Sequence, residues 1–210
     1  MRQYRIIFLL LSSLLLSSCI FLNPHRYPRP YKVRMTIIDK ATLMPIIPDT
    51  AAVKYKTSID FLNKHFTGII VLKQTDRTTK HCVFVTELGM RMFDFEMRGD
   101  SIYPVFVFDP LNKPKLVDAL ARNFKSILLV EWFNNSAQIV VKSDKEALLL
   151  WQHPRHPYLF MDENKYAVEQ QIFYGRKKES KTIYTNNYSN IKLKQYGLVK
   201  LYIELEKIKE

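Results

Sequence analysis

The sequence contains few of the residues on which common enzyme sites and disulfide scaffolds are built. It has five glycines and two cysteines in 210 residues. A Gly-Xaa-Ser-Xaa-Gly elbow, a phosphate-binding glycine loop and a zinc-protease motif are all missing from it. Internal repeats are missing as well. These absences argue against enzyme activity, and we expect a protein that binds or supports another molecule.

Two residue patterns could carry chemistry, and neither is specific. His153 and His156 lie three residues apart, but Pro154 and Pro157 indicate a rigid loop, and no cysteine or carboxylate follows at ligand spacing. Asp94 and Glu96 share one face of a predicted strand, yet two carboxylates alone do not specify hydrolysis. We therefore expect no catalytic residues, no metal site and no cofactor.

The N-terminal apolar run is too short to cross a membrane as a helix. Residues 6–16 are about half of the roughly 20 residues that a span requires. Arg2 and Arg5 precede this run, and Leu16-Ser17-Ser18-Cys19 closes it. A positive start, a short apolar segment and small residues are the plan of a secretory signal. Leu-Ser-Ser-Cys resembles the bacterial lipoprotein signal, in which the cysteine takes a diacylglyceryl group. The alternative is an uncleaved anchor helix.

This resemblance implies a division of the chain into three parts. Residues 1–18 are the expected signal peptide, and residues 19–48 are the expected lipidated Cys19 with an extended tether. Pro24, Pro28 and Pro30 keep the tether extended. Whether residues 35–48 hold a short strand or a helix stays open. Residues 49–210 form one domain with a sizeable core.

The same resemblance implies a place in the cell envelope. Ile20 is not the aspartate that keeps enteric lipoproteins in the inner membrane, so we expect the outer membrane, facing the periplasm, with Cys19 as the membrane anchor. Without Arg2 and Arg5 the net charge is (32 − 2) − 20 = +10. In this compartment a basic protein meets anionic head groups, not nucleic acid. The alternative is that the lysines only solvate strand faces.

Lipidation of Cys19 would leave Cys82 without a disulfide partner. Cys82 lies in the apolar stretch His81-Cys82-Val83-Phe84-Val85. We therefore expect it to be a small buried residue, as free cysteines commonly are.

The domain is mainly β with few helices, an α+β fold. From Val53 to Phe61 apolar and polar residues alternate, which predicts a strand with one buried face. Polar turns separate the strands that follow, which indicates an antiparallel meander. One helix is expected over residues 114–130, with Pro114 at its first position. We expect strands at residues 53–61, 66–73, 81–86, 90–97, 101–108, 137–142, 147–151, 165–174, 181–185, around 191–193 and 199–205.

Several of these strands are apolar on both faces, for example Ile69-Ile70-Val71-Leu72 and Val105-Phe106-Val107-Phe108. A sheet with one face in water would alternate instead, so something apolar must cover the second face. The sequence predicts a curved antiparallel sheet or incomplete β-barrel with the central helix on its concave face. The residues expected to line that cavity are Ile70, Leu72, Phe84, Phe93, Phe95, Phe106, Phe108, Leu120 and Phe124.

The order of elements from Phe66 to Leu129 is two strands, Glu87-Leu88-Gly89-Met90, an aromatic strand with Phe93-Asp94-Phe95, another strand and an amphipathic helix. With the meander after the helix, this order resembles the Lol-type lipoprotein carrier and outer-membrane receptor, and lipid-anchored proteins of Bacteroidetes. The chain departs from the carriers in having less lid helix, and their functional arginine has no matching position here.

The Lol-type resemblance implies an apolar cavity that binds a lipid or the acyl chain of another lipoprotein, with a role in lipid or lipoprotein trafficking. The alternative is a structural lipoprotein that anchors a larger envelope complex, with an envelope protein as partner and no small ligand.

Overall fold

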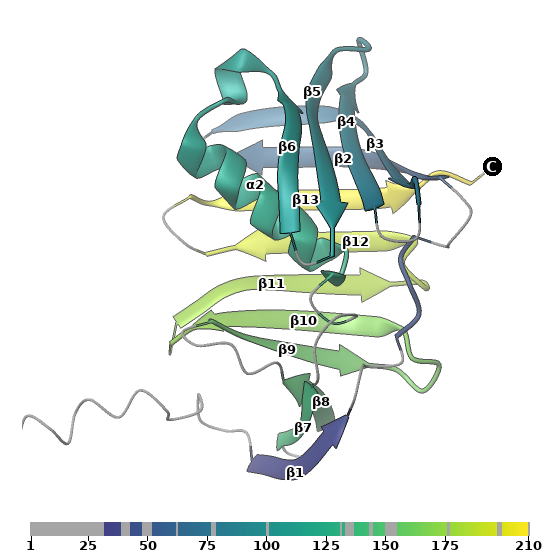
Figure 1. Cartoon of the computed structure of the whole chain (residues 1–210), viewed down its shortest axis with the longest axis vertical. Helices are drawn as coiled ribbons and strands as arrows, with labels where there is room; N and C mark the ends of the chain where they lie inside the picture. Colours follow the sequence, from purple (N-terminus) through teal and green to yellow (C-terminus); the bar gives the residue numbers. More distant parts are fainter. Residues whose placement is uncertain are drawn as a thin grey trace, which may run out of the picture. The chain divides into compact units, whose positions relative to one another are not determined.

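Thirteen strands of the computed structural model pair into one antiparallel sheet with the order β1-β7-β8-β9-β10-β11-β12-β13-β2-β3-β4-β5-β6 (Figure 1). The structure describes residues 32–38, 43–47, 52–61, 63–76, 79–99, 101–130, 132, 137–142, 145–149, 155–175, 177–196 and 199–209. Strands β1 and β6 are its two edges, so the sheet is open and not a closed barrel. The strands are β1 (Lys32–Ile38), β2 (Ala52–Phe61), β3 (Lys64–Gln74), β4 (Thr79–Thr86), β5 (Arg91–Arg98), β6 (Ser101–Val107), β7 (Ala137–Lys142), β8 (Lys145–Leu149), β9 (Arg155–Met161), β10 (Ala167–Tyr174), β11 (Lys177–Thr185), β12 (Asn190–Gln195) and β13 (Leu201–Lys207).

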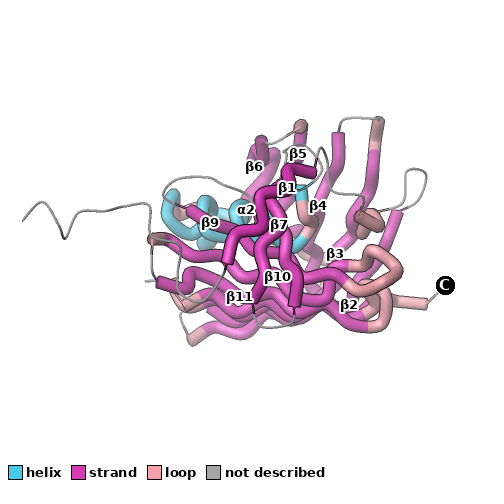
Figure 2. The backbone as a smooth tube through the Cα atoms, turned by 90° about the horizontal axis from the view of Figure 1, so that it is seen from below, coloured by secondary structure: helices cyan, strands magenta, loops and turns pink. Residues whose placement is uncertain are grey.

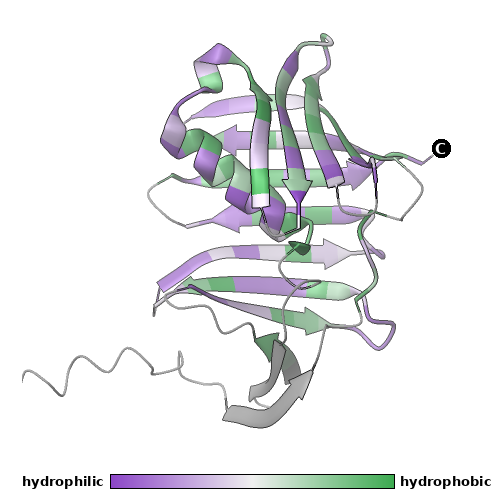
Figure 3. Ribbon diagram, in the orientation of Figure 1, coloured by the Kyte–Doolittle hydropathy of each residue, from purple (hydrophilic) through white to green (hydrophobic). Residues whose placement is uncertain are grey.

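The alternation read from the sequence is confirmed most directly in β2. Val53, Tyr55, Ile59 and Phe61 are buried, and the lysines between them are exposed. Strand β2 pairs with β3 on one side and with β13 on the other. The predicted antiparallel meander is therefore correct, and the last strand of the chain closes against the first strand of the hairpin run. Figure 3 shows hydrophobic and hydrophilic residues alternating along the strands and along the helix.

The structure decides one segment that the sequence left open and corrects another. Residues 32–38, which lie in the expected tether, form β1 and pair with β7, while Leu43, Ile46 and Ile47 belong to the buried core. Arg155–Pro157, expected as part of a rigid loop, begin β9, and Pro157 pairs opposite Ile172. Pro157 concealed β9, because proline signals turns and edges more often than paired strands.

Irregular pairing accompanies the curvature of β3 to β6. The register shifts between Phe84 and Val85 and again between Asp94 and Phe95, and such bulges bend and twist the affected strand. Gly68 allows a close approach of β3 and β4, because a Cβ atom there would lie 2.1 Å from the carbonyl oxygen of Val85. Seen from below, the strands form a trough that holds the helix (Figure 2).

Helix α2 (Pro114–Ile127) lies on the concave side and contacts β6 and β12. Proline at the first position suits a helix start, where no N–H donor is needed. The expected helix ran to residue 130, but Leu129 adopts a φ of 57° and the helical run stops at Ile127. No helix among the described residues is both long and apolar enough to span a membrane. The sheet and α2 together enclose one hydrophobic core.

Candidate functional site

An aromatic cluster fills the space between the concave face of the sheet and α2. The ring centroid of Phe93 lies 5.4 Å from that of Phe84, 4.8 Å from that of Phe95 and 5.2 Å from that of Phe124. Offset or tilted ring pairs at these separations are favourable beyond their buried area. The apolar inner face of β4 and β5 is therefore covered by a helix side chain at this point.

The structure brings together most of the side chains expected to line a cavity. Seven of them, Ile70, Leu72, Phe84, Phe93, Phe95, Leu120 and Phe124, are at most 1% exposed. Phe108 is half-buried and packs against the same core. In this structure these groups contact one another, so they form part of a packed core.

Phe106 is the exception among the nine residues. It pairs opposite Asp94, and the guanidinium carbon of Arg91 lies 4.2 Å from its ring centroid. Phe95 pairs with Pro104, so β6 carries one extra residue between these two pairs. This bulge reverses the alternation along β6 and places Phe106 on the outer face, whereas a regular strand would have put it inside.

Hydrogen bonds between buried polar side chains fix α2 on the sheet. Asn123 is 5% exposed, and its amide nitrogen donates to the carbonyl oxygen of Ala119 at 2.6 Å and to Oε1 of Gln195, on β12, at 2.5 Å. A buried polar group costs stability unless it is paired, so this contact favours one seating of the helix. The sequence analysis missed this contact, although the polar Asn123 among the apolar residues of α2 was a signal that could have found it.

Further polar groups of the sheet satisfy the carbonyls at the C-terminal end of α2. The hydroxyl of Tyr184 donates to the carbonyl oxygens of Ser126 and Ile127 at 3.3 and 3.2 Å. With its amide oriented to satisfy both groups, Gln170 donates to the Ser126 oxygen and accepts from Nε1 of the fully buried Trp132 at 2.8 Å. The last carbonyls of a helix have no partner within it, so β10 and β11 cap α2. Nothing in the local sequence pattern identified this cap.

Buried tyrosines connect residues 43–47 to the sheet. The hydroxyl of Tyr55 donates to the carbonyl oxygen of Tyr188 at 3.0 Å, and the hydroxyl of Tyr188 donates to the carbonyl oxygen of Met44 at 2.9 Å. The Ala167 N–H donates to the Tyr188 hydroxyl at 2.9 Å. Burial, reinforced by the nearby Tyr188 phenol, raises the pKa of Tyr55 to about 12, and burial raises that of Tyr188 to about 12. Both phenols are therefore neutral structural donors at ordinary pH.

The outer face of β4 and β5 carries a charged cluster around His81. Its Nδ1 lies 3.2 Å from Asp94, and its Nε2 lies 3.3 Å from Glu96. Arg91 approaches Asp94 at 3.6 Å, and Arg98 pairs with Glu96. The two carboxylates that the sequence suggested as a pair thus act as partners of cations. Among the described residues, no group of three or more His, Cys, Asp or Glu side chains could hold a metal ion.

Of the two cysteines, only Cys82 lies among the described residues. Cys82 is fully buried, as expected, and burial together with the charge of Asp94 raises the pKa of its thiol well above the ordinary value. Such a thiol is not a nucleophile at neutral pH. Cys19, the expected lipidation site, lies outside the described residues, and so does His153.

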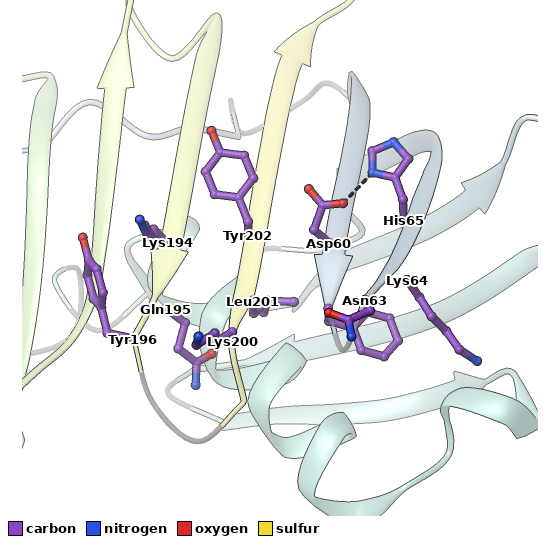
Figure 4. Close-up of a pocket in the computed structure, with 11 residues that line it drawn as sticks. Asp60, Asn63, Lys64, His65, Lys194, Gln195, Tyr196, Lys200, Leu201 and Tyr202 are labelled. Carbon is purple, nitrogen blue, oxygen red and sulfur yellow. Dashed lines mark hydrogen bonds and ion pairs between the residues drawn. The ribbon is translucent and has the colours of Figure 1, made fainter.

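An open pocket of about 930 Å³ lies at the ends of β12, β13, β2 and β3 (Figure 4). Its inner side includes Gln195 and the core residues Leu201 and Phe61. Its outer side includes Asp60, which pairs with Nδ1 of His65 at 2.5 Å. Its remaining lining residues are Asn63, Lys64, Lys194, Tyr196, Lys200 and Tyr202. Because Gln195 also binds Asn123, the pocket borders the contact between α2 and the sheet.

No protein-family model matches the sequence, and no curated protein matches it. Among solved structures, the fold is similar to the crystal structure of a LolA superfamily protein from Nitrosomonas europaea, with a TM-score of 0.50 and 10% sequence identity. The similarity covers 78% of this chain and 87% of that chain. It supports the Lol-type architecture expected from the order of elements.

Proposed function

We propose that this protein is a non-enzymatic envelope lipoprotein that binds an acyl chain, from a lipid or from another lipoprotein, between α2 and the concave face of the sheet. The observation that carries the proposal is the aromatic inner face of β4 and β5. Over Phe93 this face is covered by Phe124 of α2. Burial of an acyl chain there is favourable by roughly 25 cal/mol per Å² of apolar surface. The Lol-type fold supports this function.

Binding requires α2 to move, since Phe124 occupies the place that an acyl chain would take against Phe93. The polar contacts that hold the helix are few and specific, among them Asn123 to Gln195 and Tyr184 to the end of α2. A ligand that takes over the apolar contacts of the helix would keep the inner face of the sheet covered. Its binding would therefore expose little new apolar surface. The helix then acts as a lid on the sheet.

Native mass spectrometry of the chain purified from membranes tests this function, together with displacement of a fluorescent apolar probe by palmitate. We expect bound lipid and displaceable probe. Phe124→Leu changes the shape under the lid and should alter palmitate affinity several-fold, while the matched outer-face variant Phe106→Leu should not. Absence of both lipid and probe binding would refute the proposal.

The membrane anchor is tested separately. Cys19→Ala should move the protein from the membrane fraction to the periplasm, or leave an unprocessed precursor, and should abolish labelling by a radioactive fatty acid. Cys82→Ala serves as the control, because its buried thiol has no part in attachment. A fatty-acid label that persists on the Cys19→Ala protein would exclude this anchor.

One observation favours the alternative of a structural lipoprotein with a protein partner. On the outer face of β3 and β4, Ile69 is exposed and Val71, Val83 and Val85 are half-buried, while Leu88 at the next turn is 93% exposed. Exposed apolar patches commonly mark contact surfaces. A stoichiometric protein partner recovered from cross-linked membranes, with no lipid in the chain, would favour this alternative.

A further inference from the structure

The pocket at the ends of β12, β13, β2 and β3 changes in polarity from one side to the other. Across the strands, Lys194, Tyr202 and Asp60 form one row of paired residues on the outer face. The adjacent row on the inner face is Gln195, Leu201 and Phe61, and it ends at Lys64. Neighbouring residues of a strand point to opposite faces, so the pocket wraps around the strand ends from a charged side to a largely apolar side with Lys64 at its margin.

Positive charge is in excess in this pocket. Three lysines, Lys64, Lys194 and Lys200, line it together with one carboxylate, Asp60, which already contacts His65. No carboxylate of the described residues forms an ion pair with any of the three lysines. Nζ of Lys194 lies 5.5 Å from the ring centroid of Tyr196, which leaves its N–H donors available to an anion. Figure 4 shows Lys194 along the strand near Tyr202, Lys200 close to the strand end and Lys64 on the other side of Leu201, with its side chain directed away from the other two lysines.

The apolar side of the pocket leads to the lid. Phe61 and Leu201 are buried members of the core, and Gln195 binds Asn123 of α2. A molecule seated in the pocket therefore lies beside the contact between helix and sheet. A simple anion would use the lysines alone, whereas a molecule with an anionic head and an apolar tail matches both sides.

We propose that this pocket binds the phosphate-bearing head group of an anionic amphiphile whose acyl chain passes under α2. The inference rests on the proposed function, and it adds the chemical class of the ligand. Lysine ammonium groups bind phosphate oxygens as point charges, and these contacts are stronger beside low-dielectric protein than in open water.

The test uses the whole chain in nanodiscs that contain equal amounts of phosphatidylglycerol and phosphatidylcholine. Lipid that stays bound after release from the nanodisc is identified by native mass spectrometry. We expect phosphatidylglycerol to be enriched over phosphatidylcholine. The triple variant Lys64→Gln, Lys194→Gln, Lys200→Gln should lose this enrichment, by on the order of tenfold, while the total amount of bound lipid stays unchanged.

A matched triple variant controls for net charge. Lys73, Lys115 and Lys177 are exposed and lie outside the pocket, so Lys73→Gln, Lys115→Gln, Lys177→Gln should keep the enrichment. Equal binding of the two lipids by the wild type, or equal loss in the two triple variants, overturns the head-group site and leaves acyl-chain binding intact. If neither lipid stays bound, the head-group site and the proposed function are both overturned.

A second arm separates a head group from a free anion. Inorganic phosphate is titrated into the same three proteins by calorimetry. Weak or undetectable binding, with enrichment of phosphatidylglycerol in the first arm, supports the amphiphile. Lysine-dependent phosphate binding without lipid enrichment shows a site for a free anion and overturns the amphiphile.

Discussion

The two faces of β3 and β4 carry similar apolar residues in the middle of the strands and have opposite surroundings. On the concave face Ile70, Leu72 and Phe84 are at most 1% exposed. On the convex face of the same strands Ile69 is 40% exposed, and Val83 and Val85 are half-buried. The difference lies in the cover, because α2 and the curl of the sheet close the concave face. Hydrophobicity along a strand therefore does not identify the face that is buried.

The polar contacts of the two faces differ in the same way. On the concave side Asn123, Gln195, Tyr184 and Gln170 are buried and their hydrogen bonds have defined partners. On the convex side the ion pairs around His81 remain partly in water. Exposed ion pairs contribute about 0–1 kcal/mol, whereas breaking a buried hydrogen bond costs about 1–3 kcal/mol. Contacts on the concave side should dominate the free energy of unfolding.

The largest expected effect is that of Phe124→Ala. Its ring contacts Phe93 and Phe95 and is fully buried, so the change should lower the free energy of unfolding by about 3–5 kcal/mol. Urea unfolding measures this loss. Arg122→Ala, on the exposed side of the same helix, removes a pair with Asp118 and should cost less than about 0.5 kcal/mol. Similar losses in both variants would show that α2 is not packed on the concave face.

The second expected effect is a loss of stability at alkaline pH. Burial raises the pKa of Tyr55 and Tyr188 from 10.0 to about 12. The folded state holds these protons more tightly than the unfolded chain, so the stabilisation is complete below pH 10 and is lost as the pH rises to 12. We expect a loss of about 2–3 kcal/mol per tyrosine.

Urea unfolding at about pH 9 and about pH 11 measures this slope. Tyr55→Phe should make this slope smaller, because it removes one of the buried phenols whose pKa is raised, which include Tyr188 and Tyr184. Tyr103→Phe is the control, since Tyr103 is exposed at the sheet edge. An unchanged slope in Tyr55→Phe would show that the raised pKa of Tyr55 does not cause the loss of stability at alkaline pH.

The third expected effect concerns the cap of α2. Tyr184→Phe removes the hydroxyl that donates to the Ser126 and Ile127 carbonyls and should cost about 1–2 kcal/mol. Hydrogen exchange should rise at the C-terminal end of the helix more than elsewhere. Tyr174→Phe, an exposed position on β10, should change neither quantity. Uniform exchange along α2 in Tyr184→Phe would contradict this role.

The smallest expected effect is on the convex face. Ile69→Thr keeps a β-branched side chain at an exposed strand position and should change the free energy of unfolding by about 0.5 kcal/mol or less. The neighbouring Ile70→Thr places a hydroxyl in the core and should cost several times more. Thermal unfolding of the two variants compares adjacent residues of one strand. Equal costs would show that the convex face is also covered.

The sequence predicted the fold class, the order of most strands and the start of α2, because two-residue alternation and helical spacing are local signals. It did not predict β9, where Pro157 interrupts the pattern, and it left a strand or a helix open over residues 35–48, where β1 ends. It misplaced Phe106, because a bulge between Asp94 and Phe95 is set by pairing with a second strand.

The candidate site was predictable only in its apolar part. Aromatic residues such as Phe93 and Phe95 lie on one strand at alternate positions, so their shared face follows from the sequence. Gln170, Tyr184 and Gln195 come from three strands far from α2 in the chain, and the curl of the sheet brings them to the helix. Lys64 and Lys200, 136 positions apart by their numbers, likewise share a pocket because β2 pairs with β13.

Strand β6 ends the sheet, and this position affects how the protein behaves at high concentration. An open strand edge with exposed side chains such as Tyr103 and Val105 invites pairing with a second chain and growth into fibres. Pro104 lies between these two residues and has no N–H donor to offer to an added strand. The bulge beside it twists the edge further away from the geometry of a flat ladder. Both features make the addition of a further strand at this edge less favourable.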